Sequence, residues 1–156
     1  MQMKNLLLPT ALLAASSLFA AKDGYVSLFD GKSLDNWDGD PKFWSVQDGA
    51  ITGITTKANP TKGNTFIIYT GKEKFTNFEL LVDFKIIVGN SGIQYRSFKK
   101  SGNHDGWRIG GYQADFESGD RFSGICYGEA FRGILSLRGQ KTVLTSNNGK
   151  LQKKAE

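Results

Sequence analysis

The sequence predicts an all-β protein, built as an antiparallel sandwich or barrel. Three observations carry this prediction: helical periodicity is nearly absent, turn signals recur along the chain, and the runs between them are rich in β-branched and aromatic residues. The composition includes 19 glycines and 11 phenylalanines but only three prolines, which fits a chain that turns often. The turn signals are Asp30-Gly31, Asp48-Gly49, Lys62-Gly63-Asn64, Gly89-Asn90, Ser101-Gly102-Asn103, Ser118-Gly119-Asp120 and Asn148-Gly149.

Strands are expected wherever short apolar runs lie between these turns. The clearest candidate is Phe78–Ile86, because every second residue from Phe78 is apolar while Glu79, Asp83 and Lys85 alternate with them. That alternation predicts one buried face and one solvated face. The other expected strands are Tyr25–Phe29, Trp44–Val46, Ala50–Ile54, Thr65–Tyr69, Ile93–Phe98, Trp107–Phe116, Ser123–Tyr127, Ile134–Leu137 and Thr142–Leu144.

The two ends of the chain differ from the strand-rich middle. Residues 1–21 carry Lys4, an apolar run from Leu6 through Leu18 and small residues at Ala20 and Ala21, a pattern typical of a secretory signal peptide. The alternative is a membrane anchor, but the run is shorter than the roughly 20 residues of a spanning helix. Residues 147–156 are polar and supply no closing apolar strand, so we expect an incomplete domain over residues 22–156.

Charge and cysteine content exclude several classes of function. The net charge of +5 becomes +4 when the leader and its single lysine are removed, and the basic residues are scattered. A nucleic-acid-binding protein would gather them on one face. Cys126 is the single cysteine, so neither a disulfide framework nor a cysteine metal site is expected.

Polar residues alternate along two of the expected strands. In Asn90–Arg96, Gln94 and Arg96 fall on one face, and in Gly111–Asp115, Gln113 and Asp115 do so. If both strands turn their apolar faces inward, these four side chains form one polar surface. An acid, a guanidinium and two amides on a rigid sheet suit a sugar-binding or sugar-cleaving site. The alternative is that Arg96 and Asp115 form an ordinary cross-strand pair.

The sequence resembles the 3-keto-disaccharide hydrolase domain family, long catalogued as a domain of unknown function. The resemblance spans about Tyr25 to Leu144, and its motifs are weak singly but specific in order. They are Tyr25–Leu34 with Trp37, Phe43–Gly53, Phe78–Leu80, Asn90–Ile93 with Arg96, Gly111–Asp115, Gly124–Glu129 and Arg132–Leu135. The resemblance implies a concanavalin-like jelly-roll sandwich, a periplasmic or secreted location and action on 3-keto-glycosides. Family members usually continue for several more strands, including a strand with an Asn-Gly turn and a late Leu-Gln-Leu-His-like motif, and we expect this chain to lack both of these later elements.

Cleavage of such a substrate needs a base, an acid and a group that stabilises an enolate. A ketone at sugar C3 makes the C2 proton acidic, so its removal can expel the C1 substituent before water adds back. From strand parity and family position we expect Asp115 as the base, Glu129 as acid or partner and Arg96 at the ketone oxygen. Gln113, Gln94 and Asn90 would bind hydroxyl groups.

Each assignment has an alternative. Glu129 would otherwise be a surface charge, and Asn90 would serve turn geometry together with Gly92. His104 could act as an acid or base or contact the substrate. The alternative is an exposed histidine without a role, because it lies in a polar loop. Trp107 would stack on a sugar or fill the core. The sequence assigns no cofactor. Asp115, Glu117 and Asp120 are close in sequence and could offer oxygen ligands to a divalent cation, but spacing alone does not define such a site.

Three functions therefore compete. The first is an exported enzyme that cleaves 3-keto-glycosides or 3-keto-disaccharides. The second is a conventional glycosidase that uses Asp115 and Glu129 as its two carboxylates. The third is a non-catalytic carbohydrate-binding module. All three take a glycoside or oligosaccharide as partner, and none involves nucleic acid or a membrane span after signal cleavage.

Overall fold

The computed structural model describes residues 24–100, 106–148 and 150–156. In these residues the protein is all-β, without helices, and every strand pairing is antiparallel, consistent with a β-sandwich. The all-β prediction is confirmed. The strands are β1 (Trp37–Gly39), β2 (Trp44–Gln47), β3 (Ala50–Gly53), β4 (Ile67–Tyr69), β5 (Asn90–Lys99), β6 (Ile109–Glu117), β7 (Cys126–Glu129), β8 (Gly133–Ser136), β9 (Thr142–Asn147) and β10 (Lys150–Ala155).

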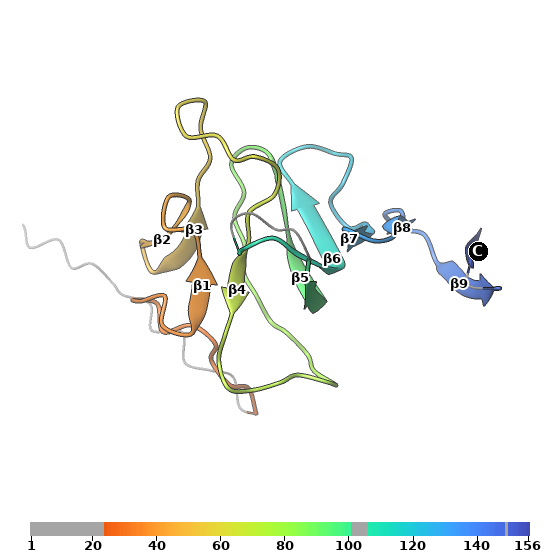
Figure 1. Ribbon diagram of the computed structural model, residues 1–156, viewed down its shortest axis with the longest axis horizontal. Helices are drawn as coiled ribbons and strands as arrows, with labels where there is room; N and C mark the ends of the chain where they lie inside the picture. Colours follow the sequence, from red (N-terminus) through yellow and green to blue (C-terminus); the bar gives the residue numbers. More distant parts are fainter. Residues whose placement is uncertain (1–23, 101–105, 149) are drawn as a thin grey trace, which may run out of the picture.

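The largest sheet contains four strands in the order β5-β6-β7-β8 (Figure 1). Three two-stranded sheets accompany it: β1 with β4, β2 with β3, and β9 with β10. The β2–β3 hairpin turns at Asp48 and Gly49, whose φ values are 50° and 75°. A two-residue turn with both residues in the left-handed region matches the strand twist, which explains the Asp-Gly pair.

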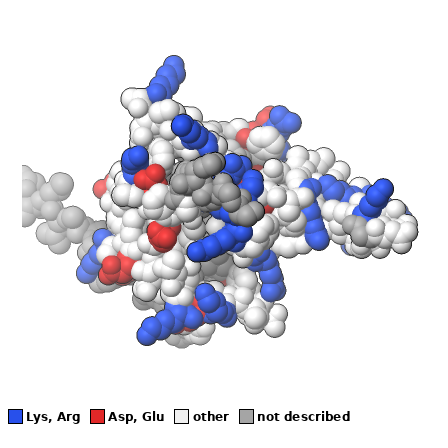
Figure 2. Space-filling model, viewed as in Figure 1, with Lys and Arg blue, Asp and Glu red and all other residues white. Residues whose placement is uncertain are grey.

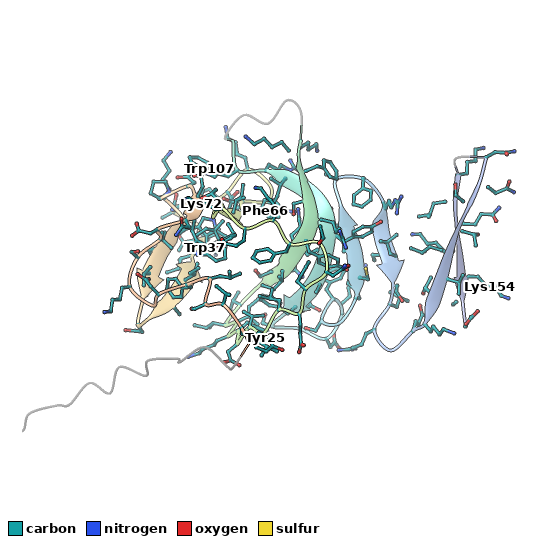
Figure 3. All side chains as sticks on the ribbon, turned by 90° about the horizontal axis from the view of Figure 1, so that it is seen from below. Tyr25, Trp37, Phe66, Lys72, Trp107 and Lys154 are labelled. Carbon is teal, nitrogen blue, oxygen red and sulfur yellow. The ribbon has the colours of Figure 1, made fainter. Side chains whose placement is uncertain are left out.

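The apolar core described by the structure is small and lies on the four-stranded sheet. Ile109, Ile125 and Leu135 are each at most 7% exposed. The β9–β10 hairpin stands apart from the remaining strands, as two perpendicular views show (Figures 1 and 3). Most of its side chains are exposed. The hairpin is held chiefly by its own ladder of hydrogen bonds, with side-chain contacts from Thr142 to Ser136 and from Lys153 to the carbonyl of Ile134 on β8.

The predicted strand Phe78–Ile86 is not formed, which corrects the sequence analysis. This segment is extended without strand pairing, and its apolar side chains are exposed, including Val82 at 50% and Phe84 at 58%. A strand exists only where a neighbour supplies hydrogen-bond partners, so alternation alone was not sufficient. Tyr25–Phe29 likewise forms no strand.

The C-terminal segment departs from expectation in the opposite direction. Residues 147–156 offered no apolar strand, yet β10 pairs with β9 along its whole length, from Lys150 opposite Asn147 to Ala155 opposite Thr142. The turn places Asn148 at φ 47°, a conformation that asparagine tolerates. Backbone pairing needs no apolar side chain, which is why hydrophobic patterning missed this strand.

Candidate functional site

The candidate site lies on the face of β6 that carries its polar residues. Gln113 is 8% exposed and Asp115 is 9% exposed, whereas Ala114 between them is exposed. The expectation that the apolar faces of β5 and β6 would point inward is therefore wrong for β6. Its polar face is covered, and its Tyr112 and Ala114 face is the more open one.

The register between β5 and β6 determines which residues share this face. Gln94 lies opposite Gln113, Gly92 opposite Asp115 and Asn90 opposite Glu117. Residues directly opposite one another in an antiparallel pair point to the same side. The predicted grouping of Gln94, Gln113 and Asp115 is therefore present.

Arg96 does not join this group. A β-bulge interrupts the register between Tyr95 and Phe98, and Arg96 within it has a φ of 53°. The bulge redirects the side chain, whose Nη2 donates to the carbonyl of Thr76 at 2.7 Å, in exposed surroundings. Arg96 and Asp115 therefore do not share a face as expected. The extra residue of the bulge interrupts the regular alternation of side chains along β5.

Asp115 is held by amides and not by a cation. The Nε2 of Gln113 donates to its Oδ1 at 2.7 Å, and the side chain of Asn90 also hydrogen-bonds to it. Burial of the carboxyl raises its pKa above the ordinary value, and the negative charges of Glu129 and Glu117 act in the same direction. The two amide hydrogen bonds oppose this change. A carboxylate with a raised pKa is a better proton acceptor near neutral pH.

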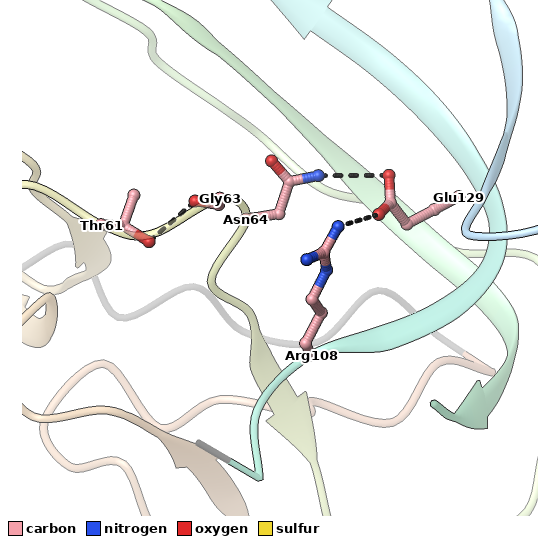
Figure 4. A network of polar contacts seen from close by, with 5 residues as sticks. All are labelled: Thr61, Gly63, Asn64, Arg108 and Glu129. Carbon is pink, nitrogen blue, oxygen red and sulfur yellow. Dashed lines mark hydrogen bonds and ion pairs between the residues drawn. The ribbon is translucent and has the colours of Figure 1, made fainter. Parts of the chain in front are cut away.

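Glu129 is the second buried carboxylate and has different partners. It lies on β7 opposite Gly111, and it is 4% exposed. The Nδ2 of Asn64 donates to its Oε2 at 3.1 Å, and Nη2 of Arg108 lies 3.9 Å from its Oε1 (Figure 4). Glu129 is therefore not a surface charge, and the arginine beside the acids is Arg108, not Arg96.

The two acids lie on the same side of adjacent strands but at different levels. Glu129 faces Gly111, four residues before Asp115, which corresponds to about 13 Å along the strand. Gln113 and Gln94 lie between these levels. A Cβ at position 111 would lie 2.9 Å from the carbonyl oxygen of Tyr95 and 3.2 Å from Cγ of Gln94, so only glycine fits there.

Gln94 carries an unused hydrogen-bonding capacity. Both its Oε1 and its Nε2 are buried, and neither has a partner within the part of the chain that the structure describes. An unsatisfied buried amide costs roughly 1–3 kcal/mol for each lost partner. A polar ligand or an ordered water between the two acids would recover this cost.

Asn64 and Arg108 were missed by sequence reasoning. Asn64 lies in the loop before β4 and reaches a residue 65 positions later in the sequence. Arg108 directly precedes β6, next to Trp107. No local pattern marks either residue, although the Lys62-Gly63-Asn64 turn signal did place a polar loop there.

Trp107 and His104 are the remaining residues predicted for substrate contact. Trp107 is half-buried, and its Nε1 donates to Oδ1 of Asp38 at 2.7 Å. His104 lies outside the described residues. Glu117 accepts a hydrogen bond from the backbone of Phe122, and within the described part of the chain no three His, Cys, Asp or Glu side chains gather as a metal site. The proposed oxygen ligands Asp115, Glu117 and Asp120 are thus not clustered.

Within residues 24–100, 106–148 and 150–156, the structure contains no helix with the length and apolar character needed to cross a membrane.

The family model described as a 3-keto-alpha-glucoside-1,2-lyase-like domain matches residues 24–155. A Bacteroides thetaiotaomicron protein named 3-keto-disaccharide hydrolase is 37% identical over 82 residues, covering 47% of this chain and 27% of that protein. The match thus spans little more than a quarter of that relative. No solved structure matches significantly.

Proposed function

Because this chain belongs to the 3-keto-alpha-glucoside-1,2-lyase-like domain family, we propose that it cleaves 3-keto-glycosides, including 3-keto-disaccharides, on the polar face of β5–β7. The observation that carries the proposal is the pair of buried acids, Asp115 and Glu129, on one side of adjacent strands. Burying two carboxylates costs free energy that pairing can offset, and such a cost is often retained at functional sites. Among the residues that the structure describes, the side-chain partners of Asp115 are the amides of Gln113 and Asn90, so ion pairing does not account for it.

The proposed reaction begins with removal of the C2 proton. Asp115 takes this proton, and the electron pair of the C–H bond forms an enolate with the C3 ketone. The enolate then re-forms the ketone and expels the C1 oxygen, leaving a double bond between C1 and C2. Addition of water across this double bond, with hydroxide equivalent at C1 and a proton at C2, completes the net hydrolysis.

The neighbouring residues have roles that follow from their positions. Glu129 with Arg108 is placed to exchange a proton with the leaving oxygen or with water. The unpartnered amide of Gln94 is placed to bind the ketone oxygen or a hydroxyl, since it lies between the two acids and has donor and acceptor atoms to offer. Gln113 both orients Asp115 and borders this position.

The location follows from the sequence of the leader. Residues 1–21 have the pattern of a cleaved signal peptide, so we propose that the chain is periplasmic or secreted. N-terminal sequencing of the exported protein would test this, and an intact Met1 on the mature protein would contradict it.

The test of the activity compares oxidised and unoxidised substrates. The purified chain is incubated with 3-keto-maltose and with maltose, and released glucose is followed over time. Release from the keto substrate alone is expected, because only a ketone acidifies C2.

Two other outcomes would contradict the proposal. Release from maltose as well would favour a conventional glycosidase with two carboxylates. Release from neither, by a sample whose folded state is shown by circular dichroism and a cooperative melt, would favour a carbohydrate-binding module.

A further inference from the structure

A surface hollow of about 330 Å³ lies beside the carboxylate network. Its lining includes Trp107, Phe43, Pro60, Asn59, Lys42 and Lys62. This volume is at the lower end of the roughly 300–1,000 Å³ typical of small-molecule sites. The hollow is therefore large enough for one small ring and too small for a long oligosaccharide.

The lining combines apolar surface with hydrogen-bond donors and one carboxylate, Asp40, and a sugar ring can use all three. The indole Nε1 of Trp107 is occupied by Asp38, so the tryptophan offers the hollow its apolar ring surface. Within residues 24–100, 106–148 and 150–156, neither Lys42 nor Lys62 forms an ion pair. Their ammonium groups can donate to hydroxyls.

Hydrogen bonds hold the walls of the hollow in place. The Nδ2 of Asn59 donates to the carbonyl of Lys42 at 2.8 Å and joins the two sides. The Oγ1 of Thr61 donates to the carbonyl of Gly63 at 2.7 Å and shapes the loop that continues to Asn64 (Figure 4). The bond between Asn59 and Lys42 ties together segments 17 residues apart in the sequence, so the hollow is more than a gap between loops.

Two short connections join the hollow to the acids. Lys62 lines the hollow, and Asn64, two residues later and at most ~7 Å away between Cα atoms, binds Glu129. Trp107 also lines it, and the next residue, Arg108, lies beside Glu129. The hollow and the Glu129 network are thus connected by chain segments of one and two residues.

We propose that this hollow binds the leaving-group sugar of a 3-keto-disaccharide, while the keto ring lies over the acids. The inference rests on the proposed function for the reaction, but sugar binding in the hollow can be measured without it. The face seen in Figure 2 carries both basic and acidic side chains scattered among uncharged ones, and a neutral sugar requires no opposite charge there.

The first experiment separates the two ring positions by kinetics. Trp107→Ala and Lys42→Ala/Lys62→Ala are assayed on 3-keto-maltose and on methyl 3-keto-α-glucoside, whose methyl leaving group cannot reach the hollow. We expect kcat/KM to fall tenfold or more for the disaccharide and less than twofold for the methyl glycoside. Equal losses on both substrates would overturn the proposal.

The matched control removes two exposed lysines elsewhere. Lys85→Ala/Lys154→Ala makes the same change in charge, on the segment before β5 and on β10. It should leave both substrates within twofold of the unchanged protein. A loss matching that of the Lys42 and Lys62 variant would attribute the effect to net charge and overturn the assignment.

The second experiment measures binding without turnover. Unoxidised maltose is titrated into ¹⁵N-labelled protein, and the indole resonance of Trp107, assigned with Trp107→Phe, is followed by NMR. We expect the resonance to shift saturably with maltose concentration, and we expect Lys42→Ala/Lys62→Ala to lower the affinity obtained from this titration at least fivefold. If the Trp107 indole resonance does not move and the protein still cleaves 3-keto-maltose, the subsite is rejected and the proposed reaction is retained. A saturable shift in a protein without turnover retains the subsite and rejects the proposed reaction.

Discussion

Two stretches of this chain share an alternation of apolar and polar residues, yet one forms a paired, buried strand and the other does not. Ile109–Glu117 forms β6, paired on both sides, and buries a carboxylate. Phe78–Ile86 has the more regular apolar pattern, forms no strand and leaves Phe84 58% exposed. Alternation shows that a segment can have two different faces. Which face is covered depends on the partners that the rest of the fold supplies.

The largest expected effect is at the buried carboxylate of β6. Asp115→Asn should lower kcat on a 3-keto-disaccharide by about 10²–10⁴-fold, the usual contribution of a positioned base. The amide has the same shape, so the melting transition should remain cooperative. Released sugar is the readout.

The matched control for this change is Asp120→Asn, at an exposed turn position. It should keep near-full activity. If Asp115→Asn were as active as Asp120→Asn, β6 would not carry the base, and its buried acid would need a structural explanation.

The second effect tests which arginine serves the site. Arg108→Gln should lower kcat/KM by ~10–100-fold, because Glu129 loses one of the groups that position it. It should also lower the free energy of unfolding by ~1–2 kcal/mol, a modest cost since the Arg108 side chain is 39% exposed. Urea denaturation measures the second quantity.

Arg96→Gln makes the same change at the bulge of β5. We expect it to lose about 1 kcal/mol or less, from its bond to Thr76, and to keep activity within threefold. If the activity losses of the two variants were reversed, Arg96 would be the functional guanidinium, as the sequence pattern suggested.

The third effect is on pH dependence and has opposite signs for activity and stability. The pKa of Asp115 is raised in the folded protein above the ordinary value of 3.8, chiefly by burial. Neutral, protonated Asp115 therefore favours the folded state. This contribution to the free energy of unfolding is complete below pH 3.8 and is lost as the pH rises through the folded pKa, because ionisation then places a charge in buried surroundings. The rate should rise over the same interval as the base ionises.

Thermal melts and kcat/KM measured across a pH series test this linkage. In Asp115→Asn the corresponding slope of stability should disappear. Persistence of the slope in this variant would assign it to another group.

The smallest effects are expected in the exposed apolar segment. Phe84→Ala should cost ~1 kcal/mol, because Phe84 stacks on Phe116 with ring centroids 4.1 Å apart. Val82→Thr should change stability by no more than about 0.5 kcal/mol, since Val82 is 50% exposed. A loss of several kcal/mol on Val82→Thr would show that Phe78–Ile86 is a buried strand in solution.

The sequence by itself determined the local features of this protein. Turn signals such as Asp48-Gly49 and β-branched runs predicted an all-β antiparallel chain, because glycine conformations and side-chain stiffness are local properties. The period of two also predicted that Gln113 and Asp115 share a face, because alternation along one regular strand needs no information about its neighbours.

The tertiary structure alone decided the composition of the site. The bulge at Arg96 changes which side chains share a face, and no residue type in the sequence marks its position. Asn64 reaches Glu129 across 65 residues, and burial of Asp115 depends on what covers β6. Long-range contacts and desolvation are properties of the assembled fold, so a pattern of neighbouring residues cannot contain them.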